Sequence, residues 1–101
     1  MSRTLPQPSR DDIDLVTVLR ALADPVRLEM LRVIAAADER CPASAEAYDV
    51  EVTAATLSHH FRVLREAGVT TTFVEGRRRW VDLRRADLDQ RFPGLLDAVV
   101  G

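Results

Sequence analysis

The chain has 101 residues, 47% of them hydrophobic, and a formal net charge of −2. These values exclude a disordered chain and leave room for one domain. No apolar run approaches the ~18 residues of a membrane-spanning helix, and the N-terminus lacks the apolar core of a signal peptide, so we expect a cytoplasmic protein with no membrane partner. Cys41 is the single cysteine and cannot form a disulfide within the chain, which agrees with a reducing compartment.

Charge is distributed unevenly along the chain. Residues 53–80 hold five arginines against two glutamates, a local charge of +3, whereas residues 1–52 hold six arginines against ten acidic residues, a local charge of −4. A negative net charge taken alone argues against a nucleic-acid partner. Its distribution instead indicates that residues 53–80 are the segment suited to an anionic partner.

The N-terminal residues predict a short tail followed by a helix. Residues 1–8 are polar, contain Pro6 and Pro8, and are predicted to be disordered. Ser9 is predicted to cap a first helix whose positive end is stabilised by nearby aspartates. This helix is apolar on more than one side, so it has one surface to bury in its own domain and another to bury against a second subunit. Its apolar residues are Ile13, Leu15, Val16, Val18, Leu19 and Leu22.

The middle of the chain predicts two further helices and a turn. Asp24 and Pro25 start a helix that runs to about Ala37, because aspartate caps helices and proline suits the first helical position. Residues 38–42 form a break, and Ser44 caps a short helix over residues 45–48. A turn then leads into the next helix, so these elements form a helix-turn-helix. The inward residues of the second helix are Val26, Met30, Leu31, Val33 and Ile34.

Residues 53–67 predict a helix suited to a DNA major groove. Thr53 caps its start, and Gly68 suits the left-handed position just past its end. A helix that enters a major groove needs small residues where it approaches closely, with hydrogen-bond donors and a cation behind them. The apolar stripe comprises Leu57, Phe61 and Leu64. The opposite, groove-facing side comprises Ala55, Ser58, His59 and Arg62.

Residues 69–83 predict two strands joined by a turn at Gly76, because both flanks are rich in β-branched and aromatic residues. Arg77, Arg78 and Arg79 gather at the tip of this hairpin. Adjacent guanidinium groups repel one another, but they become favourable when they neutralise phosphates and release counterions. A generic soluble tip is the alternative. A helix, a glycine and a basic hairpin in this order indicate a winged helix-turn-helix.

The last part of the chain, from residue 84, predicts a helical segment with one apolar stripe. Pro93 and Gly94 interrupt it, which predicts either a kinked helix or two short helices. Too little chain remains to cover both this stripe and that of the first helix. We therefore expect the terminal helices to form a homodimer interface. Its predicted residues are Ile13, Val16, Leu19, Leu88, Phe92, Leu95, Leu96 and Val99.

The run from Leu57 to Val69, followed by the motif at residues 75–78, closely resembles the ArsR/SmtB family of dimeric transcriptional repressors. Residues 19–28 look like that family's second-helix entry, and the resemblance covers roughly residues 10–100. It implies a homodimer that binds an approximately palindromic DNA site. Many members sense metals through paired cysteines, or through acidic and histidine residues on the last helix. This chain departs from both patterns, because Cys41 stands alone and residues 84–101 contain no His or Cys; no metal or cofactor is expected.

Four single residues leave alternatives open. His59 and His60 cannot both ligate one ion, because neighbours on a helix point ~100° apart. His59 is placed on the DNA side, and His60, nearer the apolar stripe, is expected to be a structural hydrogen-bonding group. Trp80 either packs under the wing or lies against the sugar-phosphate backbone. Cys41 is either a thiol sensor or a small, partly buried residue.

We therefore predict a mainly α protein with a small β-hairpin, a winged helix-turn-helix over residues 9–101. It would bind double-stranded DNA as a homodimer and act as a repressor; the residues do not identify its inducer. The sequence contains no phosphate-binding glycine loop and no nucleophile elbow, so we do not expect an enzyme. The alternatives are a protein-interaction module whose basic wing meets an acidic partner, and a single-cysteine redox-sensing repressor acting through Cys41. The predicted DNA contacts are Thr53, Ala55, Thr56, Ser58, His59, Arg62, Arg77, Arg78 and Arg79.

Overall fold

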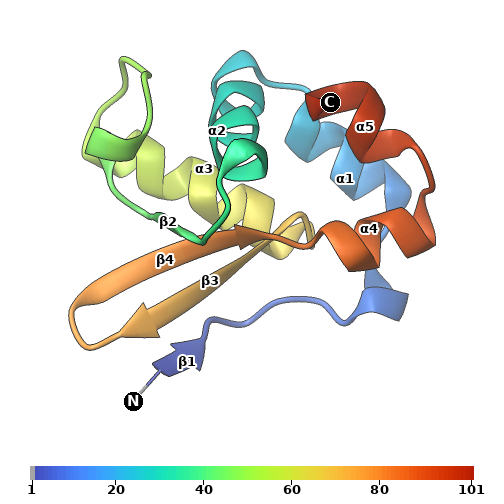
Figure 1. Ribbon diagram of the computed structural model, residues 1–101, viewed down its shortest axis with the longest axis horizontal. Helices are drawn as coiled ribbons and strands as arrows, with labels where there is room; N and C mark the ends of the chain where they lie inside the picture. The colour runs from blue at the N-terminus through green and yellow to red at the C-terminus, as the bar shows by residue number, and fades with distance from the viewer. Residues whose placement is uncertain (1) are drawn as a thin grey trace.

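The computed structural model describes residues 2–101 and places a group of helices on one side of a four-stranded antiparallel sheet (Figure 1). The helices are α1 (Leu15–Leu22), α2 (Pro25–Ala36), α3 (Ala54–Glu66), α4 (Arg85–Arg91) and α5 (Leu95–Val100), with 3₁₀ turns η1 (Arg10–Asp12) and η2 (Ala45–Ala47). The strands are β1 (Ser2–Thr4), β2 (Cys41–Pro42), β3 (Thr70–Glu75) and β4 (Arg78–Leu83). None of the helices described within residues 2–101 is long and apolar enough to cross a bilayer.

Each of the three core helices begins at a side-chain cap. Asp14, Asp24 and Thr53 accept hydrogen bonds from the backbone N–H three residues further on, at 3.0, 2.9 and 3.1 Å. The predicted starts of α2 and α3 are therefore confirmed. The predicted start of the first helix is wrong: Ser9 begins only the turn η1 and makes no cap bond to the backbone. Ile13 interrupts the helix in an extended conformation and is buried in the core, so Asp14 becomes the cap.

The core lies between the helices and the sheet. Met30 and Leu31 of α2, Leu64 of α3 and Val81 of β4 are completely buried. Burying an aliphatic side chain of this size contributes ~1.5–3 kcal/mol, so these residues fix the position of α3 against α2 and the sheet. The prediction for α2 is confirmed for Met30, Leu31 and Ile34, whereas Val26 and Val33 are only partly buried.

Gly68 ends α3 in the left-handed conformation, with φ +85°, as predicted. A second constraint applies at this position. A Cβ atom on residue 68 would lie 2.7 Å from Cγ1 of Ile13 and 3.2 Å from Cγ of Pro8. The N-terminal segment thus packs directly against the turn between α3 and β3.

The predicted hairpin is present, and it belongs to a larger sheet. Glu75 pairs with Arg78, so Gly76 and Arg77 form a two-residue turn. The strand order is β1-β3-β4-β2, so β1 and β2 flank the hairpin on both sides. The sequence reading missed these two strands, because segments of three and two residues are too short to show an alternating pattern.

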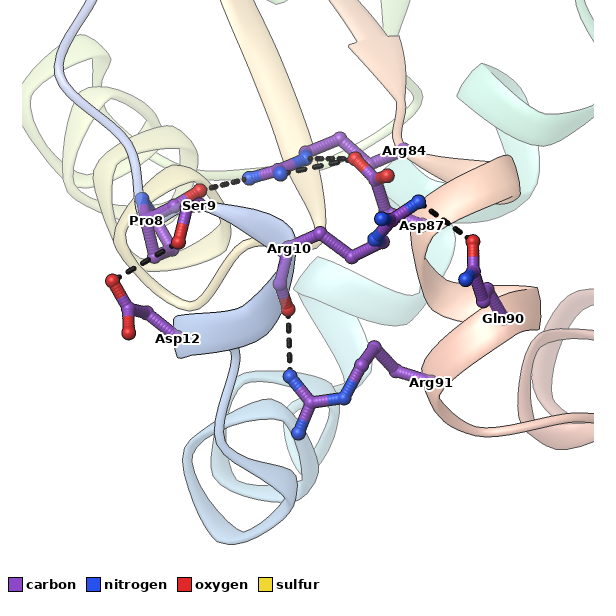
Figure 2. A network of polar contacts seen from close by, with 8 residues as sticks. All are labelled: Pro8, Ser9, Arg10, Asp12, Arg84, Asp87, Gln90 and Arg91. Atoms are coloured by element: carbon purple, nitrogen blue, oxygen red, sulfur yellow. Dashed lines mark hydrogen bonds and ion pairs between the residues drawn. The ribbon is translucent and has the colours of Figure 1, made fainter.

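Residues 2–8 differ from the disordered tail predicted for residues 1–8; Met1 lies outside the described residues. Three residues pair with β3, and the backbone N–H of Leu5 donates to the carbonyl of Thr72 at 2.9 Å. The carbonyl of Pro8 accepts from Arg84 Nη1 at 2.7 Å (Figure 2). The segment is ordered because its backbone satisfies the edge of β3, which would otherwise leave unpaired hydrogen-bonding groups.

The C-terminal stripe folds as two short helices, α4 and α5, which is one of the two predicted alternatives. Gly94, with φ +85°, separates them. The predicted short helix over residues 45–48 is only the single turn η2, and Ser44 makes no side-chain cap bond there. α1 to α3 with the extended hairpin after α3 form a winged helix-turn-helix.

Candidate nucleic-acid interface

The two sides of α3 are separated as the sequence predicts. Leu57, Phe61 and Leu64 are buried, whereas the predicted DNA-contacting residues of α3 and its cap are all exposed. Phe61 also packs edge-on against Tyr48, which follows η2, with ring centroids 5.5 Å apart. This contact holds α3 against the single turn that takes the place of the first helix of the helix-turn-helix.

A concave surface joins α3 to the wing. It encloses a hollow of about 270 Å³, which we call the α3–wing hollow. All but one of its lining residues come from α3, and Arg79 of β4 closes it from the sheet. The lining residues are Ala55, Ser58, His59, Arg62, Arg65 and Arg79. The structure therefore brings the predicted helix contacts together with one of the three predicted wing arginines, while Arg77 and Arg78 are exposed at the hairpin tip.

Arg65 also lines this surface, although it is not among the DNA contacts predicted from the sequence. It is half-buried, and its Nε atom is buried without a hydrogen-bond partner among the described residues. Positions 55, 58, 62 and 65 are spaced by three or four residues, so the helical period could have placed Arg65 on the same face. Its guanidinium therefore keeps hydrogen-bonding capacity that the described residues do not use.

His59 and Arg62 contact each other on the exposed face of α3. Arg62 Nη2 lies 3.3 Å from His59 Nδ1, and Arg62 Nε lies 3.9 Å from the Glu66 carboxylate. Because a guanidinium can only donate, Nδ1 of His59 is the acceptor in this contact. An exposed ion pair of this kind contributes little to stability, so Arg62 can exchange its carboxylate contact for a nucleic-acid acceptor at small cost.

Arginines without partners concentrate on this side of the molecule. Within residues 2–101, most guanidinium groups bind a carboxylate, an amide or histidine side chain, or a backbone carbonyl. Those for which the described residues offer no such partner are Arg3, Arg20, Arg65, Arg77, Arg78 and Arg79. Apart from Arg20 of α1, they lie on α3 or the sheet. The positive charge of this region is therefore not compensated within the chain.

His60 has the structural role predicted for it. It is buried, and its Nδ1 lies 3.1 Å from Nη1 of Arg27. The same guanidinium donates to the carbonyls of Ala21 and Arg20 at 2.6 and 3.2 Å. Burial lowers the pKa of His60, and the neighbouring Arg27 charge acts in the same direction. The neutral imidazole accepts from Arg27, and this bridge connects the end of α1 to α3.

Trp80 packs within the wing, one of the two predicted alternatives. The guanidinium of Arg40 lies over the rings of Phe73 and Trp80, 5.3 and 5.5 Å from their centroids, and forms an ion pair with Glu75. Phe73, Glu75 and Trp80 share one face of the β3–β4 ladder, and Val74 and Arg79 share the other. The aromatic residues therefore stiffen the face of the wing opposite to the α3–wing hollow.

Cys41 is buried on β2, opposite Val81. Burial raises the pKa of its thiol, and the nearby Asp82 carboxylate raises it further. A buried, protonated thiol is a poor nucleophile, which favours the packed-residue interpretation over the thiol-sensor alternative. Among residues 2–101, no three His, Cys, Asp or Glu side chains gather in a way that could hold a metal ion.

The residues predicted to form the dimer interface differ in their exposure on the single chain. Ile13, Leu88 and Leu96 are only 1–2% exposed, because their side chains pack into the core of this chain. In this structure their side chains offer almost no surface to a second subunit. Val16 and Leu19 remain exposed, at 53% and 45%, together with Leu15 at 43%, which was not in the predicted set. Phe92, Leu95 and Val99 are half-buried.

Comparison with known proteins agrees with this geometry. Residues 22–72, from the end of α1 to the middle of β3, match the sequence model of a family described as "Helix-turn-helix domain". The chain is also similar to the "Uncharacterized HTH-type transcriptional regulator YceK" of Bacillus subtilis (strain 168), with 29% identity over 89 residues that cover 88% of this chain and 89% of that protein. The residues that match the family model include α2, η2 and α3. Of these elements, α3 forms the helical wall of the α3–wing hollow. The chain belongs to the helix-turn-helix domain family.

Proposed function

We propose that this protein is a DNA-binding transcriptional repressor that acts as a homodimer on an inverted-repeat site. In this proposal α3 enters the major groove and the β3–β4 wing lies against neighbouring phosphates. The observation that carries it is the α3–wing hollow, where an exposed, partly cationic helix face and an arginine of the wing meet on one concave surface. The name of the Bacillus relative, a transcriptional regulator, supports the same function.

The chemistry of α3 changes along its length in the way a groove-reading helix requires. Ala55 and Ser58 are small and lie near its N-terminal end, which permits close approach to base edges. Arg62 follows one turn later, and a planar guanidinium can donate to O6 and N7 of a guanine together. His59 is exposed beside it and contacts it at 3.3 Å. Arg62 is therefore the proposed base-specific contact.

The wing arginines have a different proposed role. Arg77 and Arg78 are exposed at the tip of a two-residue turn, without carboxylate partners among the described residues. A rigid hairpin tip outside the groove reaches the backbone more easily than base edges. Each phosphate neutralised there releases counterions and adds sequence-independent affinity.

The dimer proposal rests on α1 and on the resemblance to the ArsR/SmtB family. Leu15, Val16 and Leu19 are large apolar side chains that lie close together on one short helix and remain exposed. An exposed apolar patch on a small domain marks an interaction site. A two-fold dimer through this patch would present two α3 helices to the two halves of a palindromic site.

The test begins with selection of bound duplexes from a random pool, followed by measurement of affinity for the selected site and for random-sequence DNA. Arg62→Ala should relax discrimination at one base pair, at a cost of ~1–3 kcal/mol for the preferred sequence. Arg78→Ala should weaken both kinds of DNA equally and reduce the salt slope by about one unit for each lost phosphate contact. Arg32→Ala is the matched control, since it removes one positive charge from α2, outside α3 and the sheet.

Two mutants that both kept the wild-type affinity and salt slope would refute the assignment of these two surfaces. A wild-type protein that bound no duplex, but bound an acidic protein through Arg77 and Arg78, would support the protein-interaction alternative instead.

A further inference from the structure

The N-terminal strand β1 lies beside the tip half of the wing (Figure 1). Arg3 of β1 is directly opposite Val74 of β3, and Val74 is directly opposite Arg79 of β4. Residues directly opposite each other in antiparallel strands project to the same face of the sheet. Arg3 therefore shares a face with Arg79, which lines the α3–wing hollow. Two steps of ~5 Å across the strands place their Cα atoms about 10 Å apart.

This face of the sheet carries no opposing charge. In the β3–β4 ladder the acidic residues are Glu75 and Asp82, and both belong to the other face by the alternation of the strands. Arg40 also neutralises Glu75. Arg3 is exposed, and among residues 2–101 its guanidinium has no hydrogen-bond or ion-pair partner. Arg3 and Arg79 are therefore the charged residues that β1, β3 and β4 place on this face, whereas Arg78, opposite Glu75, belongs to the other face.

Contacts at both ends hold the segment that carries Arg3. β1 and Leu5 bond to the edge of β3, as described above. Further along, Arg84 holds the carbonyl of Pro8 while its other nitrogens bind Asp87 at 3.0 and 3.1 Å, and Arg91 donates to the carbonyl of Arg10 at 2.6 Å (Figure 2). While β1 is docked on β3, these bonds hold its backbone, and only the side chain of Arg3 must be ordered when it meets a ligand, which lowers the entropic cost of binding.

We propose that β1 is a third element of the DNA-binding surface, and that Arg3 contacts a backbone phosphate next to those bound by the wing. The ligand chemistry is a phosphodiester oxygen of duplex DNA, since arginines most often contact the phosphate backbone and Arg3 lies on an edge strand outside the groove-facing helix. This inference rests on the proposed DNA-binding function.

The experiment measures binding of the full-length chain to a labelled random-sequence duplex as a function of salt. Arg3→Ala should reduce the magnitude of the salt slope by about 0.9 for each bound copy of the chain. When salt is lowered from 1 M to 0.1 M, the affinity of this variant should therefore rise about eightfold less than that of the wild type, for each copy bound. Arg3→Lys keeps the charge and should keep the wild-type slope. Arg32→Ala removes the same charge from α2 and should also keep it. Preference for the selected site over random DNA should be unchanged in all three.

The outcomes separate this inference from the function on which it rests. If Arg78→Ala lowers the slope but Arg3→Ala does not, β1 is not a DNA-binding element and the proposed function stands. If neither variant changes the slope, both proposals are wrong. Thermal unfolding of each variant checks the fold, and a lower slope for Arg3→Ala with restoration by Arg3→Lys assigns the effect to charge.

Discussion

Substituting Gly68 tests how tightly the N-terminal segment closes over the end of α3. Gly68→Ala imposes two penalties. A non-glycine residue at φ +85° costs ~1–3 kcal/mol in backbone strain. The new Cβ would also lie 2.7 Å from Ile13 Cγ1 and 3.0 Å from its Cδ1, and inserting a methyl into a packed site costs a further ~1–3 kcal/mol. We expect a total loss of ~2–6 kcal/mol in the free energy of unfolding.

Gly94→Ala provides the matched control for this prediction. Gly94 has the same φ of +85°, but nothing lies within 4 Å of the position its Cβ would take. The difference between the two variants therefore isolates the steric contribution, which should be ~1–3 kcal/mol. Urea unfolding followed by circular dichroism at one fixed protein concentration measures both values. Equal losses for the two variants would refute the packing of Ile13 against Gly68.

The remaining predictions concern His60 and the α1 surface. Since the pKa of His60 is lower in the folded protein than its ordinary value of 6.5, the unfolded chain binds more protons below that pH, and stability should fall on acidification through this window. His60→Asn keeps an acceptor for Arg27 but does not titrate, so its stability should fall less than that of the wild type between pH ~7.5 and ~5.5. Equal losses of stability in the two proteins would contradict the role of His60. The charged or titratable neighbours of His60 are Asp24, Arg27 and His59. Leu19→Glu places a charge on the exposed apolar patch of α1, and sedimentation should then show monomers with weaker DNA binding, whereas a monomeric wild type at micromolar concentration would refute the dimer.

Local chemistry in the sequence was sufficient to predict α2, α3 and the hairpin. Thr53, Asp24 and Gly68 act within a few residues of themselves, so their roles as caps and terminator could be predicted without any tertiary information. The exposed face of α3 followed from the helical period alone. The same period places Arg65 on this face, where it lines the α3–wing hollow together with Arg79 of another element.

The structure differs from what the sequence suggests where distant segments meet. When the terminal helices are considered separately, Ile13 and Leu96 look like surface residues that a second subunit would cover. In the folded chain both residues pack into its own core. β1 has no alternating pattern and becomes a strand only because β3 offers it a free edge. Neither arrangement leaves a signal in the local sequence.

The strand order has a consequence for how the protein folds. β3 and β4 are neighbours in the sequence and can pair locally, whereas β1 joins the sheet from the opposite end of the chain. Closing a long loop costs more entropy than closing a hairpin, so we expect β1 to dock late in folding. A three-residue edge strand is also the kind of element that opens locally while the core stays folded. The amount of positive charge beside the wing would then vary with the docking equilibrium of β1.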